Sequence, residues 1–182
     1  MGQLSAEDRA QITAYLERTR EALLETTSDM PPARWTWRAA EESWTAAECA
    51  EHIVIVESIL LTRALKTADR EVEPERAAKT AGKELKLVER LPARLFKAKA
   101  PDGMHPTGRY SGPGEFHSEF AAVRTRVIDM VRESNAPLHH VVDPHFALGD
   151  LTGAQWLWFI AAHSERHLNQ IREVMASPGF PA

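Results

Sequence analysis

The chain has 182 residues, a formal net charge of −4, and apolar and charged fractions that are ordinary for a globular protein. We interpret residues 1–182 as a single domain. Acidic and basic residues are interspersed without a basic cluster, which excludes nucleic acid as an expected partner. The N-terminus is polar, the longest apolar stretches are too short to span a bilayer, and Cys49 is the only cysteine. The sequence therefore predicts a cytoplasmic protein with no membrane partner.

The first predicted helix runs from about Ser5 to Ser28, where apolar residues recur at intervals of three and four. Ser5 is a suitable N-cap, and Asp8 three residues later favours the positive end of the helix dipole. Pro31 and Pro32 close the segment, because a residue before proline is pushed out of helical geometry.

The second predicted helix runs from Thr45 to about Leu65. Thr45 and Glu48 have the spacing of a capping box, in which each side chain accepts a backbone N–H of the other residue. The β-branched residues within 52–56 would also suit a strand, but the cap and the unbroken apolar pattern favour a helix. This helix is apolar around most of its circumference, so we expect it to be central.

Residues 68–111 are rich in basic residues and proline. We expect them to form a long crossover connection that contains one short helix between about Pro74 and Leu91. A third long helix is predicted from Pro113 to Ser134, since proline is favoured at the first helical position and an apolar stripe follows.

A loop from Asn135 to Asp150 is expected to lead to the last helix. Thr152 and Gln155 form a second capping box at its start, and Pro178 ends it. The four long segments predict an all-α fold, a four-helix bundle with a long crossover connection and a short extra helix.

Three histidines occupy apolar positions of these helices. His163 and His167 are four residues apart in the last helix, so both rings lie on one face and can converge on one ion. His52 is near the start of the most apolar helix, and a metal ion would satisfy all three imidazoles. The alternative is that each is a hydrogen-bonded core histidine. Glu165 is displaced by one position from the Glu of the H-E-x-x-H motif, so we do not predict a protease.

Other polar residues near the triad are weaker candidates. Gln170 could orient a bound water, or it could be a hydrogen-bonded residue of the helix face. Glu48 could be a base, although its capping role already explains it, and Cys49 is best interpreted as a small buried hydrophobe. Arg109 and Arg166 are candidates for binding an anionic thiol cofactor.

The remaining histidines are given less weight. We expect solvated side chains at His105, His117, His139 and His140. The role of His145 is left open, because its loop leads directly into the helix of His163.

Three motifs together resemble the DinB/YfiT-like family: Trp44–His52, His145–Thr152 and His163–Ile171. The resemblance extends over nearly the full chain and implies a four-helix bundle with a divalent ion held by His52, His163 and His167. It further implies metal-dependent hydrolase activity or the transfer of low-molecular-weight thiols, and a homodimer.

The predicted site suggests an enzyme, because three neutral imidazoles leave a bound ion with open coordination positions. A low-molecular-weight thiol or water, activated by the ion, would attack an electrophilic small molecule. Zinc or nickel is the expected ion, and iron or manganese is also compatible. Two alternatives stay open: a non-catalytic metal-binding or stress-associated homodimer, and an interaction module without metal.

Overall fold

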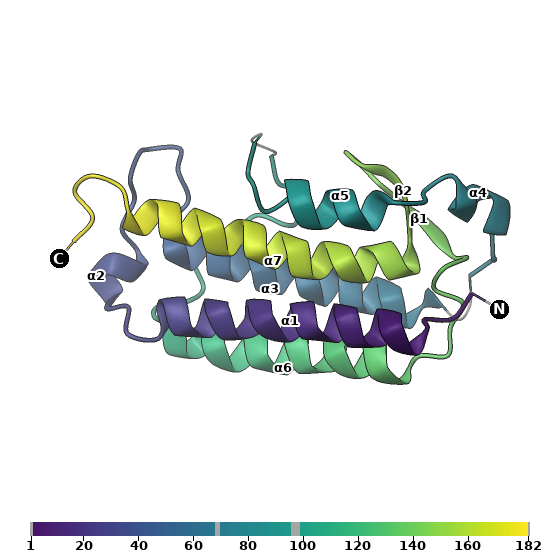
Figure 1. The fold of residues 1–182 in the computed structure, drawn as a ribbon. Coiled ribbons are helices and arrows are strands. Elements are labelled where there is room, and N and C mark those ends of the chain that lie inside the picture. Colours follow the sequence, from purple (N-terminus) through teal and green to yellow (C-terminus); the bar gives the residue numbers. More distant parts are fainter. Residues whose placement is uncertain (1, 68–69, 96–98, 182) are drawn as a thin grey trace.

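In the computed structural model, which describes residues 2–67, 70–95 and 99–181, four long helices lie side by side (Figure 1). They are α1 (Ala6–Thr27), α3 (Ala46–Leu65), α6 (Pro113–Glu133) and α7 (Gly153–Met175). Helices α1 and α3 each pack against both α6 and α7, so they occupy opposite corners of the bundle. The predicted four-helix bundle is confirmed. Within the described residues, none of the helices has the length and apolar character needed to cross a membrane.

Side-chain caps explain where these helices begin. Three pairs of residues form capping boxes. In each pair, the first side chain accepts a hydrogen bond from the backbone N–H of the second residue, and the second side chain accepts one from the backbone N–H of the first. Two otherwise unpaired donors are thereby satisfied. The pairs are Ser5 and Asp8, Thr45 and Glu48, and Thr152 and Gln155. Proline takes the first position of α6 and of the short helix α2 (Pro32–Trp35), where no N–H is needed.

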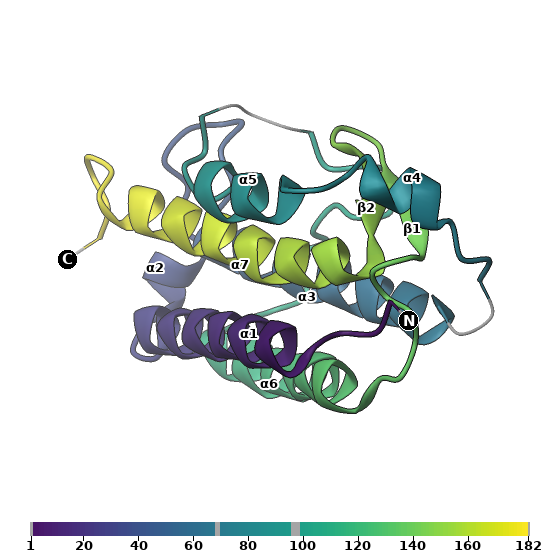
Figure 2. The same ribbon diagram turned by 45° about the vertical axis from the view of Figure 1, so that its right-hand side comes forward.

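In its described residues, the crossover between α3 and α6 contains two short helices instead of the one predicted between Pro74 and Leu91. These are α4 (Pro74–Ala78) and α5 (Lys83–Arg90), and α5 lies along α7 (Figure 2). Gly82 separates them with a φ of 76°, a left-handed conformation that interrupts a helix. Residues 68–69 and 96–98 of the predicted crossover lie outside the described residues.

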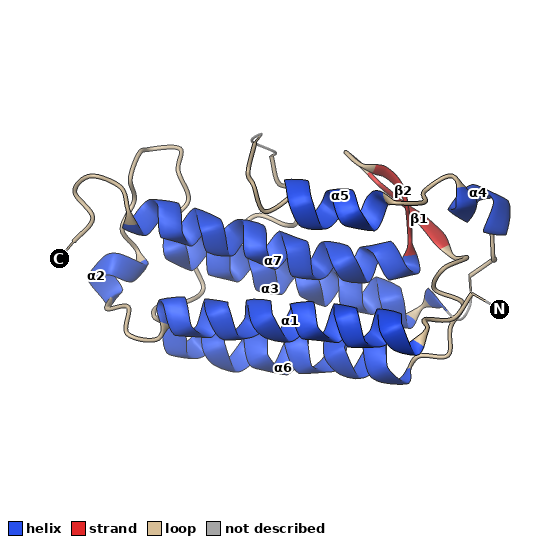
Figure 3. Cartoon of the chain, in the orientation of Figure 1, coloured by secondary structure: helices blue, strands red, loops and turns tan. Residues whose placement is uncertain are grey.

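The prediction of a loop from Asn135 to Asp150 is wrong in its second half. Strands β1 (Val142–His145) and β2 (Gly149–Thr152) form an antiparallel hairpin, with His145 opposite Gly149 (Figure 3). Thr152 ends this hairpin and also caps α7. The described part of the chain is therefore mostly helical with one small sheet. The hairpin is followed directly by α7, the helix that contains His163 and His167.

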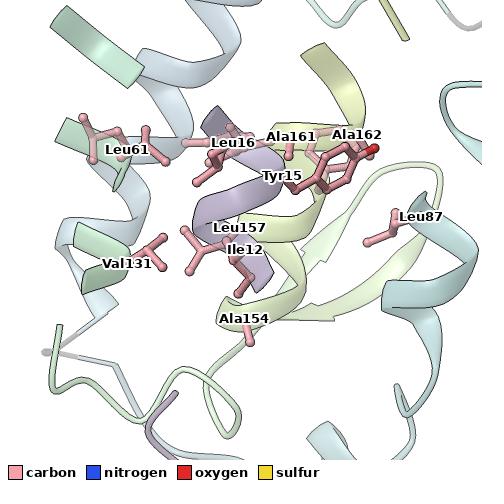
Figure 4. Close-up of a cluster of buried hydrophobic side chains, with 14 of the residues drawn as sticks. Ile12, Tyr15, Leu16, Leu61, Leu87, Val131, Ala154, Leu157, Ala161 and Ala162 are labelled. Carbon is pink, nitrogen blue, oxygen red and sulfur yellow. The ribbon is translucent and has the colours of Figure 1, made fainter. Parts of the chain in front are cut away.

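The apolar core consists of two clusters arranged along the bundle. Figure 4 shows one of them, in which Leu16 from α1, Val131 from α6 and Leu157 from α7 lie close together. The other contains Trp35 and Phe116, both fully buried. Burial of this kind stabilises the fold by about 25 cal/mol per Å² of apolar surface removed from water.

A polar layer of buried side chains joins the four long helices. The guanidinium of Arg124 in α6 forms a bidentate ion pair with the carboxylate of Glu57 in α3. Its Nη1 donates to the Leu16 carbonyl at 2.6 Å and to Thr19 Oγ1 at 2.8 Å in α1. Ser164 Oγ of α7 accepts from Arg124 and donates to Glu57, both at 2.7 Å. Each of the four long helices therefore contributes to one hydrogen-bonded network.

Candidate metal centre

Three imidazole rings meet between α3 and α7. His52 projects from α3, while His163 and His167, one turn apart, project from α7. Their potential ligand atoms all lie within 4.8 Å of one another, and Nε2 of His52 is 3.2 Å from Nε2 of His163. The exposed fractions are only 4%, 8% and 6% for His52, His163 and His167. The structure thus brings together the three histidines that the sequence singled out.

The ring of His52 is oriented by the main chain of the crossover. Its Nδ1 lies 2.6 Å from the carbonyl oxygen of Met104. Since a carbonyl only accepts, Nδ1 carries the proton and Nε2 keeps its lone pair. This lone pair faces Nε2 of His163 at 3.2 Å, where it accepts a hydrogen bond from the His163 ring, and it is oriented as a metal ligand requires.

His167 is oriented by a side chain of its own helix. Its Nδ1 lies 3.0 Å from Oε1 of Gln170, and Nη1 of Arg94 donates to the same oxygen at 2.8 Å. Nε of Arg94 in turn pairs with Glu173, at 2.9 Å from Oε1. The candidate Gln170 therefore lies against a histidine ring with its oxygen already shared by two partners. An amide oxygen that receives Nδ1–H leaves Nε2 as the lone-pair nitrogen.

His163 differs from the other two rings, because its Nδ1 is buried and has no hydrogen-bond partner among the described residues. The ring stacks on Phe159 at a centroid distance of 5.4 Å. A buried polar atom left unpaired costs about 1–3 kcal/mol. The site is therefore incomplete as a purely hydrogen-bonded cluster.

Burial keeps these imidazoles neutral. The pKa of His52 is lowered by burial and by His105, against the Met104 hydrogen bond that raises it. The pKa values of His163 and His167 are lowered well below 6.5, first by burial and then by the neighbouring histidines. Metal ligands must be unprotonated, so this environment suits them near neutral pH.

The donor set fits a divalent ion. Two nitrogens bound to one tetrahedral ion at about 2.0–2.1 Å are separated by about 3.4 Å, close to the 3.2 Å between Nε2 of His52 and of His163. Trp44 covers the cluster, with its ring 4.9 Å from the ring of His52 and 5.8 Å from that of His167. Three neutral donors in an apolar enclosure are able to hold one cation and leave further coordination positions open.

The other candidates lie in different surroundings. Glu48 completes the α3 cap and pairs with Arg38. Cys49 is fully buried, and burial raises the pKa of its thiol. Arg109 bonds to the side chains of Tyr110 and Glu119.

Arg166, the second arginine considered for anion binding, is buried and donates to the Leu91 carbonyl at 3.2 Å. Its side chain therefore helps to attach the crossover to α7.

Among the remaining histidines, His105 is exposed as expected. His117, expected to be solvated, is half-buried and lies 2.7 Å from Thr27 Oγ1, because α6 packs its first turns against the end of α1. His139 and His140 are also half-buried, and His139 pairs with Asp8. These contacts could not be read from the local sequence.

His145 lies in the hairpin that precedes α7. Its Nδ1 accepts the backbone N–H groups of Ala147 and Leu148 at 3.1 and 3.2 Å. Its ring centroid is 5.0 Å from that of Phe159, the residue that stacks on His163. Burial, with a contribution from Arg63, lowers the pKa of His145 to about 4.

Two residues that orient the histidine triad have no signal in the sequence. Met104 acts through its main-chain carbonyl, which every residue possesses. Arg94 reaches Gln170 from the crossover, where its backbone φ of 53° is uncommon for a residue with a side chain. Both depend on how the crossover returns to the bundle.

The fold and the buried histidine triad together define a helical bundle of the DinB type. The family model of the DinB superfamily matches residues 15–171, so the chain belongs to this superfamily. The family that the three sequence motifs indicated is thereby confirmed.

Two proteins of Bacillus subtilis are similar to this chain. The uncharacterized protein YuaE is 26% identical over 161 residues, which are 85% of this chain and 93% of YuaE. The solved structure of YfiT matches with a TM-score of 0.68 and 13% identity, covering 100% of this chain and 93% of YfiT. YfiT is described as "a probable metal-dependent hydrolase with an unusual four-helix bundle topology". At that identity the likeness shows a shared fold.

Proposed function

We propose that this protein is a metal-dependent enzyme in which His52, His163 and His167 bind one divalent ion. Water or a low-molecular-weight thiol, activated at this site, attacks an electrophilic small molecule. The observation that carries the proposal is the convergence of three buried imidazoles whose ligand atoms lie within 4.8 Å of one another. The description of YfiT, a protein of the same fold, as a probable metal-dependent hydrolase supports it.

A bound divalent ion supplies Lewis-acid chemistry and makes water or a thiol nucleophilic near neutral pH. The chain contributes orientation and a dry enclosure. Met104 and Gln170 hold the Nδ1 atoms of two rings. Trp44 stacks on the ring of His167, and Phe159 stacks on the ring of His163. Imidazole donors suit zinc or nickel, and iron or manganese is also compatible.

The test of the site is elemental analysis of the purified protein, before and after reconstitution with each metal. We expect about one ion per chain in the wild type and none in a His52→Ala/His167→Ala variant. A His105→Ala/His139→Ala variant removes the same number of histidines outside the triad and should keep the ion. Circular dichroism checks that all three proteins are folded. An absence of metal in the reconstituted wild type would refute the proposed site.

Turnover is tested separately on the metal-loaded protein, with panels of hydrolysable esters and amides and of electrophiles supplied with thiols. Activity that disappears on chelation and returns with metal supports the enzyme. Stoichiometric metal without turnover, together with a large fall in melting temperature on chelation, would instead support the non-catalytic metal-binding alternative.

The homodimer implied by the family resemblance stays a prediction, as does the cytoplasmic location. Sedimentation analysis of the wild type at several concentrations tests the homodimer directly. A monomer at all concentrations would exclude it without bearing on the metal site.

A further inference from the structure

We propose that Glu51 is a positioning residue for the ligand His52, acting through the segment Met104–Arg109. The inference rests on the proposed function, since it assigns Glu51 to the support of the same metal site. Glu51 immediately precedes His52 in α3, and the two side chains bond to two ends of one segment.

The carboxylate of Glu51 is buried, with 1% of the side chain exposed. Its Oε1 accepts the backbone N–H of Thr107 at 2.8 Å and the Thr107 hydroxyl at 2.7 Å. Its Oε2 accepts the backbone N–H of Gly108 at 2.8 Å and of Arg109 at 3.2 Å. Three successive backbone donors therefore converge on one charged group, and such charge-assisted bonds are among the strongest in proteins.

The segment depends on this carboxylate, because residues 104–109 form no helix or strand of their own. Gly108 has a φ of 81°, a left-handed conformation that turns successive N–H groups toward the same acceptor. Without the carboxylate, these three amides lose their acceptor inside the protein.

Met104 lies at the other end of the same segment, and its carbonyl oxygen is 2.6 Å from Nδ1 of His52. This contact selects the tautomer with the lone pair on Nε2, which faces His163. Displacing the segment removes the acceptor, so the proton of His52 redistributes between the two ring nitrogens. The Nε2–H tautomer cannot bind a metal through Nε2, and metal affinity falls.

The experiment compares the wild type with Glu51→Gln, whose amide group places N–H donors against the backbone N–H groups of Gly108 and Arg109. Long-range proton–nitrogen NMR of the metal-free protein reports the tautomer of His52. We expect one tautomer, with hydrogen on Nδ1, in the wild type and a mixture in the variant. Competition with a chelator should show zinc affinity reduced about 10- to 100-fold in the variant.

Glu119→Gln is the matched control, because Glu119, like Glu51, pairs with Arg109, but its hydrogen bonds go to the side chains of Arg109 and Tyr110 and not to the backbone of the segment. Thr107→Val removes one of the four bonds and should weaken zinc binding by a smaller factor, which keeps the proposal testable where Glu51→Gln does not fold. A role in stability alone would lower the melting temperature and leave the tautomer unchanged.

The two proposals fail in different ways. A wild type that binds zinc, with unchanged affinity and an unchanged His52 tautomer in Glu51→Gln and Thr107→Val, would overturn the role of Glu51. A wild type that binds no metal, with a tautomer that shifts in Glu51→Gln, would overturn the metal site and still support the positioning of His52 by Glu51.

Discussion

Two buried polar clusters lie next to each other in this bundle, and they differ in completeness. In the polar layer, Arg124 and Glu57 are both 0% exposed, and the hydrogen bonds among Arg124, Glu57 and Ser164 occupy their polar groups. In the histidine cluster, by contrast, Nδ1 of His163 has no hydrogen-bond partner among the described residues. His163 is the residue directly before Ser164 in the chain.

This is the difference that we expect between a structural cluster and the proposed metal site. A network whose donors and acceptors are matched within the chain needs nothing from outside and contributes to the specificity of packing. In the histidine cluster the ring nitrogens converge from two helices, with two Nε2 atoms only 3.2 Å apart, so one cation could bind them together. The polar layer and the histidine cluster are thus similarly buried, but we expect the first to stabilise packing and the second to bind an ion.

The largest effect is expected from breaking the complete cluster. Arg124→Met leaves the Glu57 carboxylate buried without its counter-ion, and removal of one partner of a buried pair costs about 3–5 kcal/mol. Urea unfolding at neutral pH measures this loss. Arg132→Met removes an exposed pair with Glu17 and should cost less than about 1 kcal/mol. Equal losses in the two variants would contradict the distinction.

Binding of metal at the histidine cluster should give the next largest effect. At a free metal concentration 100 times the dissociation constant, binding to the native state stabilises it by about 2.7 kcal/mol. His163→Leu should gain nothing from the metal, and its metal-free form should be no less stable than the wild type, because the unpaired Nδ1 is gone. Thermal unfolding with a metal titration checks both statements. Equal stabilisation of the variant by metal would refute the role of His163.

Altering the partner of His167 should have a smaller effect. Gln170→Leu removes the acceptor of Nδ1 and should weaken metal binding about 10-fold, which is about 1.4 kcal/mol. Gln170→Glu offers a stronger acceptor and should keep or raise the affinity. Chelator competition compares the two variants, and an equal loss in both would show that the hydrogen bond itself is unimportant.

The smallest effect concerns His145 and pH. Because its pKa is about 4 in the folded chain and about 6.5 when unfolded, the unfolded state binds more protons between these values. The free energy of unfolding therefore falls as pH decreases from 6.5 to 4. After a discount for solvent screening of this half-buried ring, the contribution is about 1 kcal/mol. NMR titration checks the pKa, and metal-free His145→Asn should lose less stability than the wild type on acidification.

Sequence patterns predicted the parts of the molecule that depend on local periodicity. Capping boxes at Thr45 and Thr152 located two helix starts, and the spacing of His163 and His167 placed both rings on one face. These features lie within one or two helical turns, so the residues themselves encode them. The structure brings His52 to the same point through the packing of α3 against α7.

The missed features depend on contacts between distant segments. The two strands have four residues each and no clear alternation of apolar and polar side chains, so the sequence predicts a loop as far as Asp150. The acceptor of His52 is a carbonyl, and the partners of Arg124 come from three other helices. Such contacts exist only after the chain has folded, and no spacing rule encodes them.

The polar layer also has a consequence for how the bundle assembles. Arg124 finds acceptors on α1, α3 and α7, so any assembly that lacks one of these helices leaves part of its guanidinium without a partner in an apolar interior. Partial bundles are thereby penalised, and docking of the four long helices becomes cooperative. Detachment of a single helix therefore carries this cost, and we expect slow amide exchange to be shared by all four.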